Sequence, residues 1–342
     1  NVIGTIHGKR PGKTILMDGH IDTVDVIDEA QWTHGPFSGE IADGKIYGRG
    51  ASDMKGSDCA MVMAAGRFAA QTKKNFAGTI CVSGTVHEEC FEGVAPREVT
   101  KRVKPDFVIV GEATSTSIKI GQRGRAEVVV ETEGVSCHSS NPEKGVNAVY
   151  GMMAVIEEIR KIVPNEHPLL GRGILELTDI VSAPYPGASV VPAACRATFD
   201  RRTLVGEDEA VILGQVEEAI ARAQEKHPEI KARCYLATGT EACWTGDTIS
   251  AKRYFPAWVV DENSELVVKA RRGLEAAGID APLSHFSFCT NGSHFCGEAG
   301  IPTIGYGPSL ESLAHVRDEY IEISQLTKAC RGFASILAEL TR

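Results

Sequence analysis

The feature that most constrains the fold is the alternation of short apolar runs with helical stretches over residues 1–120. The apolar runs are TILMDGH, GTICVSGTVHE and PDFVIVGE, and the Ala- and Met-rich stretch KGSDCAMVMAAGRFAAQ separates the first two. Short runs rich in Val and Ile indicate buried strands, and strands that alternate with helices favour a parallel sheet. We therefore predict an α/β domain with a mostly parallel central sheet.

A second pattern begins near residue 121. There RGRAEVVVETEG alternates apolar and polar residues, as a strand with one face in water does. The elements expected next are a helix over 145–162, strands over 173–181 and 190–200, a helix over 207–226 and a strand over 229–236. This βαββαβ order predicts a ferredoxin-like domain at 121–236, inserted into a larger domain made of 1–120 and 237–342.

Composition and charge exclude several classes of protein. A formal net charge of -9, without a block of Lys and Arg, would repel a nucleic-acid backbone. No apolar run approaches the roughly 18 residues that a membrane span needs, so neither nucleic acid nor a membrane is an expected partner. The 10 cysteines lack close pairs and indicate free thiols in a reducing, cytoplasmic location. The chain opens inside an expected strand without Met, so we expect residues upstream of Asn1.

Polar residues that can bind a metal follow the ends of the expected strands. His20 and Asp22 lie two residues apart at the end of one strand and therefore face the same side. Asp53 follows the glycine-rich turn YGRGAS. This turn is not a dinucleotide fingerprint, because a carboxylate stands in place of the third glycine and would repel a pyrophosphate.

Further acids and a second histidine extend this pattern. Glu88 and Glu89 follow the next strand, Glu112 ends a third, and His315 precedes the final helix. Each group alone also fits a structural role, because acids at strand ends are often merely solvated. Their convergence favours a site, since ligands of α/β sheets collect outside the carboxyl ends of the strands. Such a mixed nitrogen and oxygen site suits a divalent metal, with Zn²⁺ favoured and Mn²⁺ or Co²⁺ as alternatives.

The series GHIDTVDV, GRGASDMKG, HEEC, GEAT, CHSS and AHVRDEY, in this order and spacing over essentially the whole chain, resembles the M20 family of dinuclear metallohydrolases. This family includes aminoacylases, succinyl-diaminopimelate desuccinylases, acetylornithine deacetylases, dipeptidases and glutamate carboxypeptidases. More loosely, the chain resembles the selenium-metabolism-linked hydrolases within it. The resemblance implies a catalytic domain that binds two divalent ions, with Zn favoured, and an inserted domain that acts in dimerisation and as a lid.

The resemblance also implies a metal-binding role for the residues that match the ligands of the family. Asp53 would bridge the two ions. His20 and Glu112 would complete the ligands of one ion, and Glu89 and His315 those of the other.

Five further residues match catalytic or substrate-binding positions of the family. Asp22 would orient the neighbouring histidine ligand, and Glu88 would act as the general base. His138 would reach the active site of the partner subunit in a homodimer and stabilise the oxyanion. Arg202 would bind a substrate carboxylate, although Ser189 stands where the family usually has Asn and so departs from the pattern.

The segment TNGSHF near 290–295 departs from the Gly-Gly-Thr-Asp that many members of the family carry there. Asn291, Ser293 and His294 would either shape a different substrate pocket, or His294 would simply be buried.

The expected reaction is hydrolysis of the amide bond of an N-acyl amino acid or short peptide, with a metal-bridged water as the nucleophile. One alternative is attack on a ureido or carbamoyl substrate by the same site. Another, from a different class, is a family member that binds metal or peptide without catalysis.

Overall fold

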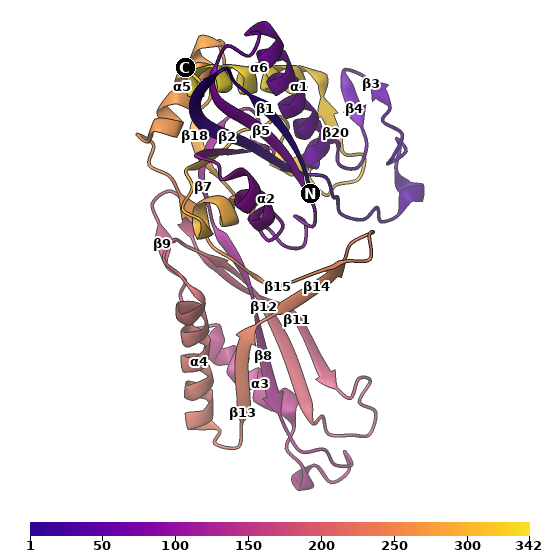
Figure 1. Ribbon diagram of the computed structural model, residues 1–342. Helices are drawn as coiled ribbons and strands as arrows, with labels where there is room; N and C mark the ends of the chain where they lie inside the picture. Colours follow the sequence, from indigo (N-terminus) through magenta and orange to yellow (C-terminus); the bar gives the residue numbers. More distant parts are fainter. The chain divides into compact units, whose positions relative to one another are not determined.

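The computed structural model describes all residues, 1–342, and divides them into two compact units. The larger unit consists of Asn1–Gln122 and Trp258–Arg342, and the inserted unit consists of Arg123–Ala257 (Figure 1). The chain leaves the larger unit close to the expected boundary at residue 120. None of the helices is long and apolar enough to cross a membrane.

A mixed eight-stranded sheet forms the centre of the larger unit. Its strand order is β1-β5-β2-β6-β19-β7-β17, with β18 paired to β7. The neighbours β5, β2, β6 and β19 run parallel, whereas β1, β7 and β17 join the sheet in antiparallel fashion. The predicted α/β class with a mostly parallel central sheet is therefore confirmed. The strands are β1 Val2–His7, β2 Arg10–His20, β5 Ala77–Thr85, β6 Phe107–Val110, β7 Ile118–Gln122, β17 Trp258–Val259, β18 Leu283–Phe286 and β19 Thr303–Gly305.

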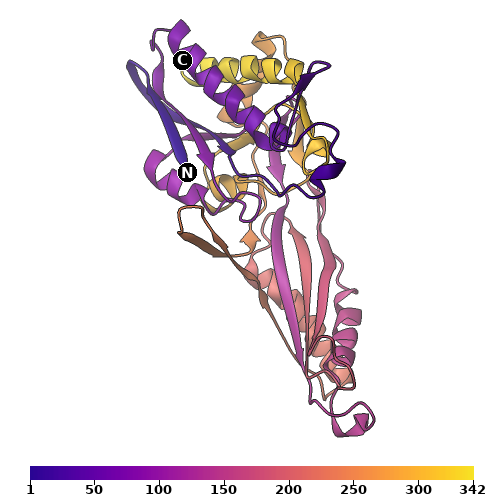
Figure 2. The same ribbon diagram turned by 90° about the vertical axis from the view of Figure 1, so that its right-hand side faces the viewer.

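Helices cover both faces of this sheet. Helix α6 packs against α1 and α5 on one face, while α2 lies on the other face (Figures 1 and 2). Buried Ala60, Ala64 and Ala65 let α1 approach the sheet closely, because their side chains are small. A separate three-stranded sheet flanks the unit and pairs β20 with β4 and β4 with β3. The bounds are α1 Gly56–Gln71, α2 Pro96–Val103, α5 Glu265–Ala276, α6 Ile323–Leu340, β3 Ile41–Ala42, β4 Lys45–Tyr47 and β20 Tyr320–Glu322.

The carboxyl ends of the parallel strands β2, β5 and β6 lie side by side at the same end of the sheet. His20 at the end of β2 lies opposite Thr85 at the end of β5, and Asp18 of β2 lies opposite Val110 at the end of β6. The segments that follow β2, β5 and β6 therefore emerge side by side. This arrangement is the one in which α/β sheets usually build their ligand sites.

The inserted unit has a five-stranded antiparallel sheet, in which four strands follow the order β11-β12-β8-β13 and β16 pairs with β8. Helices α3 and α4 pack against it through a buried core that includes Val128 and Val130 of β8, Val155 of α3, Phe199 of β12 and Val216 of α4. Both the predicted βαββαβ order and the antiparallel pairing are those of a ferredoxin-like fold. The bounds are β8 Gly124–Glu133, α3 Ala148–Ile159, β9 Glu166–His167, β10 Gly171–Arg172, β11 Ile174–Ala183, β12 Ala194–Thr203, α4 Glu209–Lys226 and β13 Lys231–Leu236.

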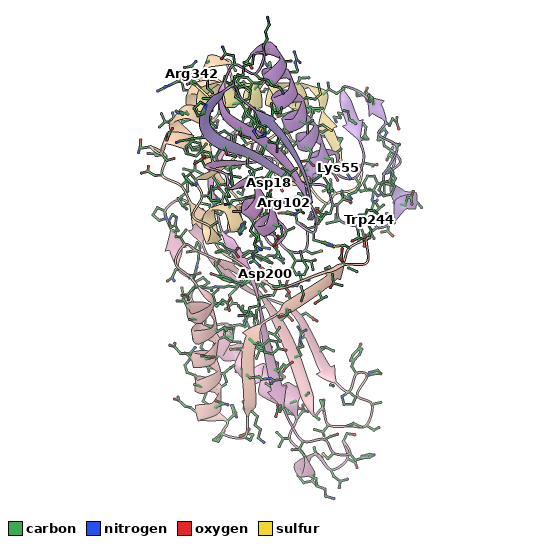
Figure 3. The ribbon with its side chains drawn as sticks, viewed as in Figure 1. Asp18, Lys55, Arg102, Asp200, Trp244 and Arg342 are labelled. Atoms are coloured by element: carbon green, nitrogen blue, oxygen red, sulfur yellow. The ribbon has the colours of Figure 1, made fainter.

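The inserted unit extends beyond the expected boundary at residue 236, to Ala257. A hairpin of β14 Thr238–Ala242 and β15 Thr248–Lys252 follows β13, with the exposed Trp244 in its turn (Figure 3). The chain then returns as β16 Tyr254–Phe255 to pair with β8. The boundary moves because backbone hydrogen bonds to β8 keep residues 254–255 with the insertion.

We expect Phe333→Ala to lower the free energy of unfolding by about 3–5 kcal/mol, because the substitution leaves a cavity in the core. Phe333 of α6 is 0% exposed, and its ring meets Tyr306 edge to face at 5.0 Å. Chemical denaturation followed by circular dichroism measures the change. The matched control is Phe37→Ala, since Phe37 is 76% exposed. Equal losses of stability in the two variants would contradict the packing described.

Candidate metal centre

Asp53 lies in a loop between β4 and α1 that one carboxylate holds in place. Glu319 is 0% exposed. Its Oε1 accepts hydrogen bonds from the backbone N–H groups of Ser52 at 2.8 Å and Asp53 at 3.0 Å. Its Oε2 accepts from the Arg49 guanidinium at 2.7 Å and from the Gly50 N–H at 3.1 Å. The loop therefore wraps around a single buried side chain, which fixes where the Asp53 carboxylate can point.

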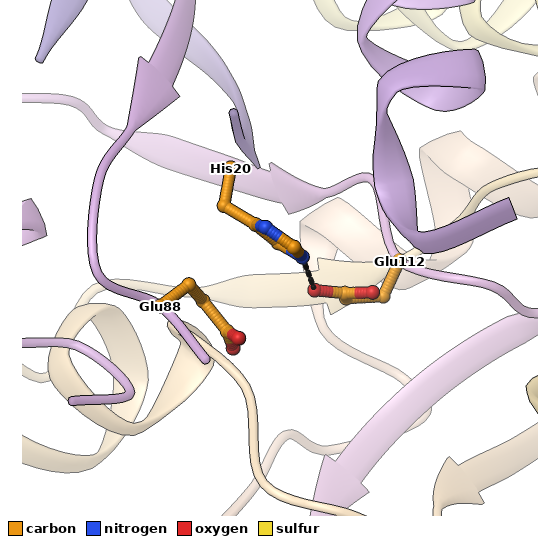
Figure 4. A group of neighbouring side chains, drawn as sticks. All are labelled: His20, Glu88 and Glu112. Carbon is orange, nitrogen blue, oxygen red and sulfur yellow. Dashed lines mark ion pairs between the residues drawn. The ribbon is translucent and has the colours of Figure 1, made fainter. Parts of the chain in front are cut away.

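His20 is completely buried, and its two ring nitrogens meet different groups. Its Nδ1 lies 3.0 Å from the backbone carbonyl oxygen of Asp22, which can only accept, so Nδ1 carries the proton. Its Nε2 lies 2.9 Å from Asp53 Oδ1 and 3.5 Å from Glu112 Oε1 (Figure 4). In neutral His20 the Nε2 lone pair thus faces carboxylate oxygens, an arrangement that requires either a second proton or a cation between them.

His315 repeats this arrangement on the other side of Asp53. Its Nε2 lies 2.9 Å from Glu89 Oε2 and 3.3 Å from Asp53 Oδ2. Asp53 therefore presents one carboxylate oxygen to each histidine. The Asp22 side chain joins the two halves, because its Oδ2 accepts a hydrogen bond from the Glu89 N–H at 3.2 Å.

Glu88 completes the cluster. Ligand atoms of His20, Glu88 and Glu112 lie within 4.8 Å of one another, and so do those of His20, Asp53 and Glu89. Figure 4 shows the Glu88 side chain beside His20 and Glu112. Its Oε1 is buried and has no hydrogen-bond partner.

The pKa values reflect the crowding of negative charge. Burial opposes protonation of His20, but hydrogen bonds to Asp22 and Asp53 raise its pKa well above 6.5. Burial, together with repulsion from neighbouring carboxylates, raises the pKa values of Glu88 and Glu112 well above their usual range. The shifts reflect a concentration of buried negative charge, which divalent cations would relieve.

The residues present fit two divalent cations. Imidazole and carboxylate ligands suit Zn²⁺ and related metals, and Asp53 faces both halves as a bridging ligand must. Glu89 Oε1, like Glu88 Oε1, is buried without a hydrogen-bond partner, so acceptor capacity is left for a cation. The structure brings together all of the metal-binding residues expected from the sequence, namely His20, Asp53, Glu89, Glu112 and His315, with Glu88 beside them. Their individual roles stay a prediction.

Three residues of the inserted unit have roles that also stay predictions. His138 is exposed, and its Nδ1 accepts a hydrogen bond from the Ser140 N–H at 3.1 Å. Ser189 has a left-handed backbone with φ 58, and its carbonyl accepts from Ser139. Arg202 on β12 donates from Nε to Asp200 at 2.7 Å, so its charge is partly compensated within the strand.

The TNGSHF segment is held in the larger unit by side-chain hydrogen bonds to several other segments. His294 is 8% exposed and lies between Glu298, at 2.7 Å, and Thr100 of α2, at 3.0 Å. The Asn291 amide donates to Asp18 and Thr85, each at 2.9 Å. The buried alternative for His294 therefore holds, and both side chains bind protein groups.

The sequence alone does not reveal the structural role of Glu319, although Glu319 lies in the motif AHVRDEY. Its partners lie near residue 50, far away in the chain, so no local spacing reveals the pairing. The only signal in the sequence is a charged residue, Arg49, inside the glycine-rich turn YGRGAS.

Imidazole and carboxylate groups gathered at the carboxyl ends of parallel strands form a candidate site for divalent metal. The family model described as Peptidase family M20/M25/M40 matches residues 16–339 of this chain. The chain belongs to this family and is a metal-dependent amidohydrolase or peptidase.

Curated relatives and solved structures are similar to this chain over most of its length. The chain is 32% identical to the Escherichia coli protein YgeY, described as uncharacterized, over 98% of this chain and 82% of the relative. It is 29% identical to a succinyl-diaminopimelate desuccinylase from Cereibacter sphaeroides, over 93% of this chain and 81% of the relative. Among solved structures, the Bacillus subtilis YXEP protein, described as a dinuclear metal binding peptidase from the M20 family, has the same fold with a TM-score of 0.70. That match has 13% sequence identity and covers 98% of this chain and 83% of that one.

We expect Glu319→Gln to weaken metal binding by about 10- to 100-fold, as is typical when a group that orients a ligand is lost. The amide would place an NH₂ group against N–H donors of the loop and release Asp53 from its position. Metal titration monitored by calorimetry measures the affinity, and circular dichroism checks the fold. The control is Glu322→Gln, an exposed acid three residues further on. A folded Glu319→Gln protein with unchanged metal affinity would contradict this role.

A second expectation concerns the stability of the metal-free protein at high pH. Hydrogen bonds to Asp53 and Glu89 raise the pKa of His315 to about 10, from its usual 6.5. A raised pKa means that the folded state holds the proton more tightly, so this stabilisation is complete below about pH 6.5 and is lost as the pH rises through about 10. The free energy of unfolding should therefore fall between pH 7 and 10, and fall less steeply in His315→Gln. The free energy of unfolding is measured by urea denaturation after chelator treatment. An equal dependence on pH in the two proteins would refute this role of His315.

Proposed function

We propose that the protein hydrolyses the amide bond of an N-acyl amino acid or short peptide, with Glu88 as the general base. The observation that carries this proposal is the buried, unpartnered Glu88 carboxylate oxygen beside a cluster suited to two divalent cations. The family acts on small peptides and acyl amino acids. The relative described as a succinyl-diaminopimelate desuccinylase is itself an amide hydrolase by name.

The metal-binding residues would be His20, Asp53, Glu89, Glu112 and His315. Two divalent cations held there would polarise the scissile carbonyl and lower the pKa of a water molecule. Zn²⁺ is the first choice for this ligand set, with Co²⁺ and Mn²⁺ as alternatives.

The chain itself supplies proton transfer and orientation. Glu88 would accept the proton of the attacking water and deliver it to the leaving nitrogen, which accelerates such reactions by roughly 10²- to 10⁴-fold. Its burial raises its pKa above the usual range of a glutamate. The Asp22 carbonyl holds the Nδ1 proton of His20 and thereby turns Nε2 toward Asp53 and Glu112.

The inserted unit would contribute to the reaction in a homodimer. His138 is exposed, and its Nδ1 already accepts a hydrogen bond, so Nε2 is the nitrogen that would donate to a developing oxyanion. We propose that it does so in the active site of the partner subunit, and that Arg202 and Ser189 contact the substrate. Sedimentation as a monomer at working concentration would contradict this part of the proposal.

We expect Glu88→Gln to lower kcat on an N-acyl amino acid by roughly 10²- to 10⁴-fold while the protein still binds two metal ions per chain. Metal content by elemental analysis and turnover with added Zn²⁺, Mn²⁺ or Co²⁺ are measured on the same preparations. The control is Glu98→Gln, which changes an exposed acid on α2 that is not assigned to the reaction. Loss of a metal ion in Glu88→Gln would make Glu88 a ligand instead, and unchanged turnover would exclude it as the base.

A further inference from the structure

A cavity of about 350 Å³ lies beside the candidate metal centre, within the larger unit. His315 belongs both to the wall of this cavity and to the metal cluster, where it lies 2.9 Å from Glu89. The cavity is formed by the loop after β2, by Arg49 and by the segment before β20. A molecule that fills it therefore touches a residue of the reacting centre.

Contacts within the protein hold the cavity walls. Asp318 Oδ1 accepts hydrogen bonds from the backbone N–H groups of Thr33 at 2.8 Å and His34 at 3.1 Å, which ties the two loops together. The Arg49 guanidinium lies 5.2 Å from the ring centroid of Trp32 and pairs with Glu319. Because these contacts need no ligand, the cavity is preformed, as small-molecule sites usually are.

Both charged and apolar side chains line the cavity. Arg317 is exposed and has no hydrogen bond or ion pair, whereas the charge of Arg49 is compensated by Glu319. Arg317 is thus the guanidinium that a ligand can use. Asp25 and Asp28, both exposed, come from the loop after β2.

These side chains complement a group that carries a carboxylate and an ammonium together. The planar guanidinium of Arg317 suits a carboxylate, and the aspartates suit an ammonium. Apolar walls come from Val24, Ile27 and Trp32 and suit the methylene carbons of such a group. The volume lies at the small end of the range for ligand pockets, which fits one amino acid.

We infer that this cavity is a substrate subsite for a free α-amino-acid group, with Arg317 binding its carboxylate and Asp25 and Asp28 its ammonium. The inference rests on the proposed amide hydrolysis and deepens it. The substrate class is an amide whose far end is a free amino acid, such as a diamino acid acylated on its side-chain nitrogen. Arg202 has less to offer this carboxylate, because it is already paired with Asp200.

The first experiment measures binding without catalysis. L-norleucine carries both charged groups, hexanoate lacks the ammonium, and pentylamine lacks the carboxylate. Calorimetry on the purified full chain, with and without chelator, should show norleucine binding at least about tenfold more tightly than either. Arg317→Met should weaken norleucine binding by about tenfold. The matched control Arg102→Met, an exposed arginine on α2 in the same unit, should leave it unchanged.

Three outcomes overturn the subsite. Norleucine binding no tighter than hexanoate is one, and equal weakening by the two arginine substitutions is another. Loss of norleucine binding on chelation is the third, because it would mean that the amino acid binds the metal itself.

The second experiment measures catalysis on matched amides. Nε-acetyl-lysine should have a kcat/KM at least about tenfold above those of 6-acetamidohexanoate and N-acetylcadaverine, and Arg317→Met should remove this preference chiefly through KM. A kcat loss shared by all three amides would instead place Arg317 in the support of His315 and overturn the subsite.

The two experiments separate failure of the subsite from failure of the proposed function. Norleucine binding that depends on Arg317, without hydrolysis of any amide, keeps the subsite and refutes the function. Metal-dependent hydrolysis of other N-acyl amino acids, without norleucine binding, keeps the function and refutes the subsite.

Discussion

The mutual repulsion of the carboxylates around Asp53 is the constraint on which the rest of the site depends. Glu88 and Glu112 are almost completely buried beside His20, which in turn meets Asp53, in surroundings that screen their charges poorly. Such a cluster costs folding free energy unless protons or cations compensate it. The two histidines provide that compensation in part, since each sits against one oxygen of Asp53. The fold therefore keeps, at the carboxyl ends of its parallel strands, a charge imbalance that divalent metal would relieve.

The fold supports this imbalance with a second layer of contacts. Glu319 collects the donors of the loop that carries Asp53, and the Asp22 carbonyl sets the tautomer of His20. The Asn291 amide donates to Asp18 of β2, so the sheet beneath the site is tied to the 290–298 segment. Each of these contacts joins segments far apart in the chain, which is why the geometry of the centre depends on the complete larger unit.

The sequence predicts the elements and their convergence well, and predicts their supporting contacts poorly. Strand periodicity and the polar residues that follow the strands are enough to bring His20, Glu88 and Glu112 to one edge, because parallel strands share their carboxyl ends. Arg49 and Glu319 lie 270 residues apart, so no local pattern announces their pairing.

Two other differences between the expected and the observed structure also arise from contacts between distant parts of the chain. The insertion was expected to end at residue 236, but a short strand with little periodicity, at 254–255, returns to pair with β8. The burial of His294 depends on Thr100 and Glu298, which only the folded chain brings to its two ring nitrogens.

The place where the insertion leaves and rejoins the larger unit has an evolutionary consequence. Gln122 at the end of β7 and Trp258 at the start of β17 are directly paired neighbours in one antiparallel ladder. The inserted unit thus occupies the position of a hairpin loop, and its two ends meet within a single pair of residues. Because a loop at such a position tolerates large changes in length, the insertion can be exchanged, enlarged or removed as a module without shifting the register of the sheet that carries the candidate metal-binding residues.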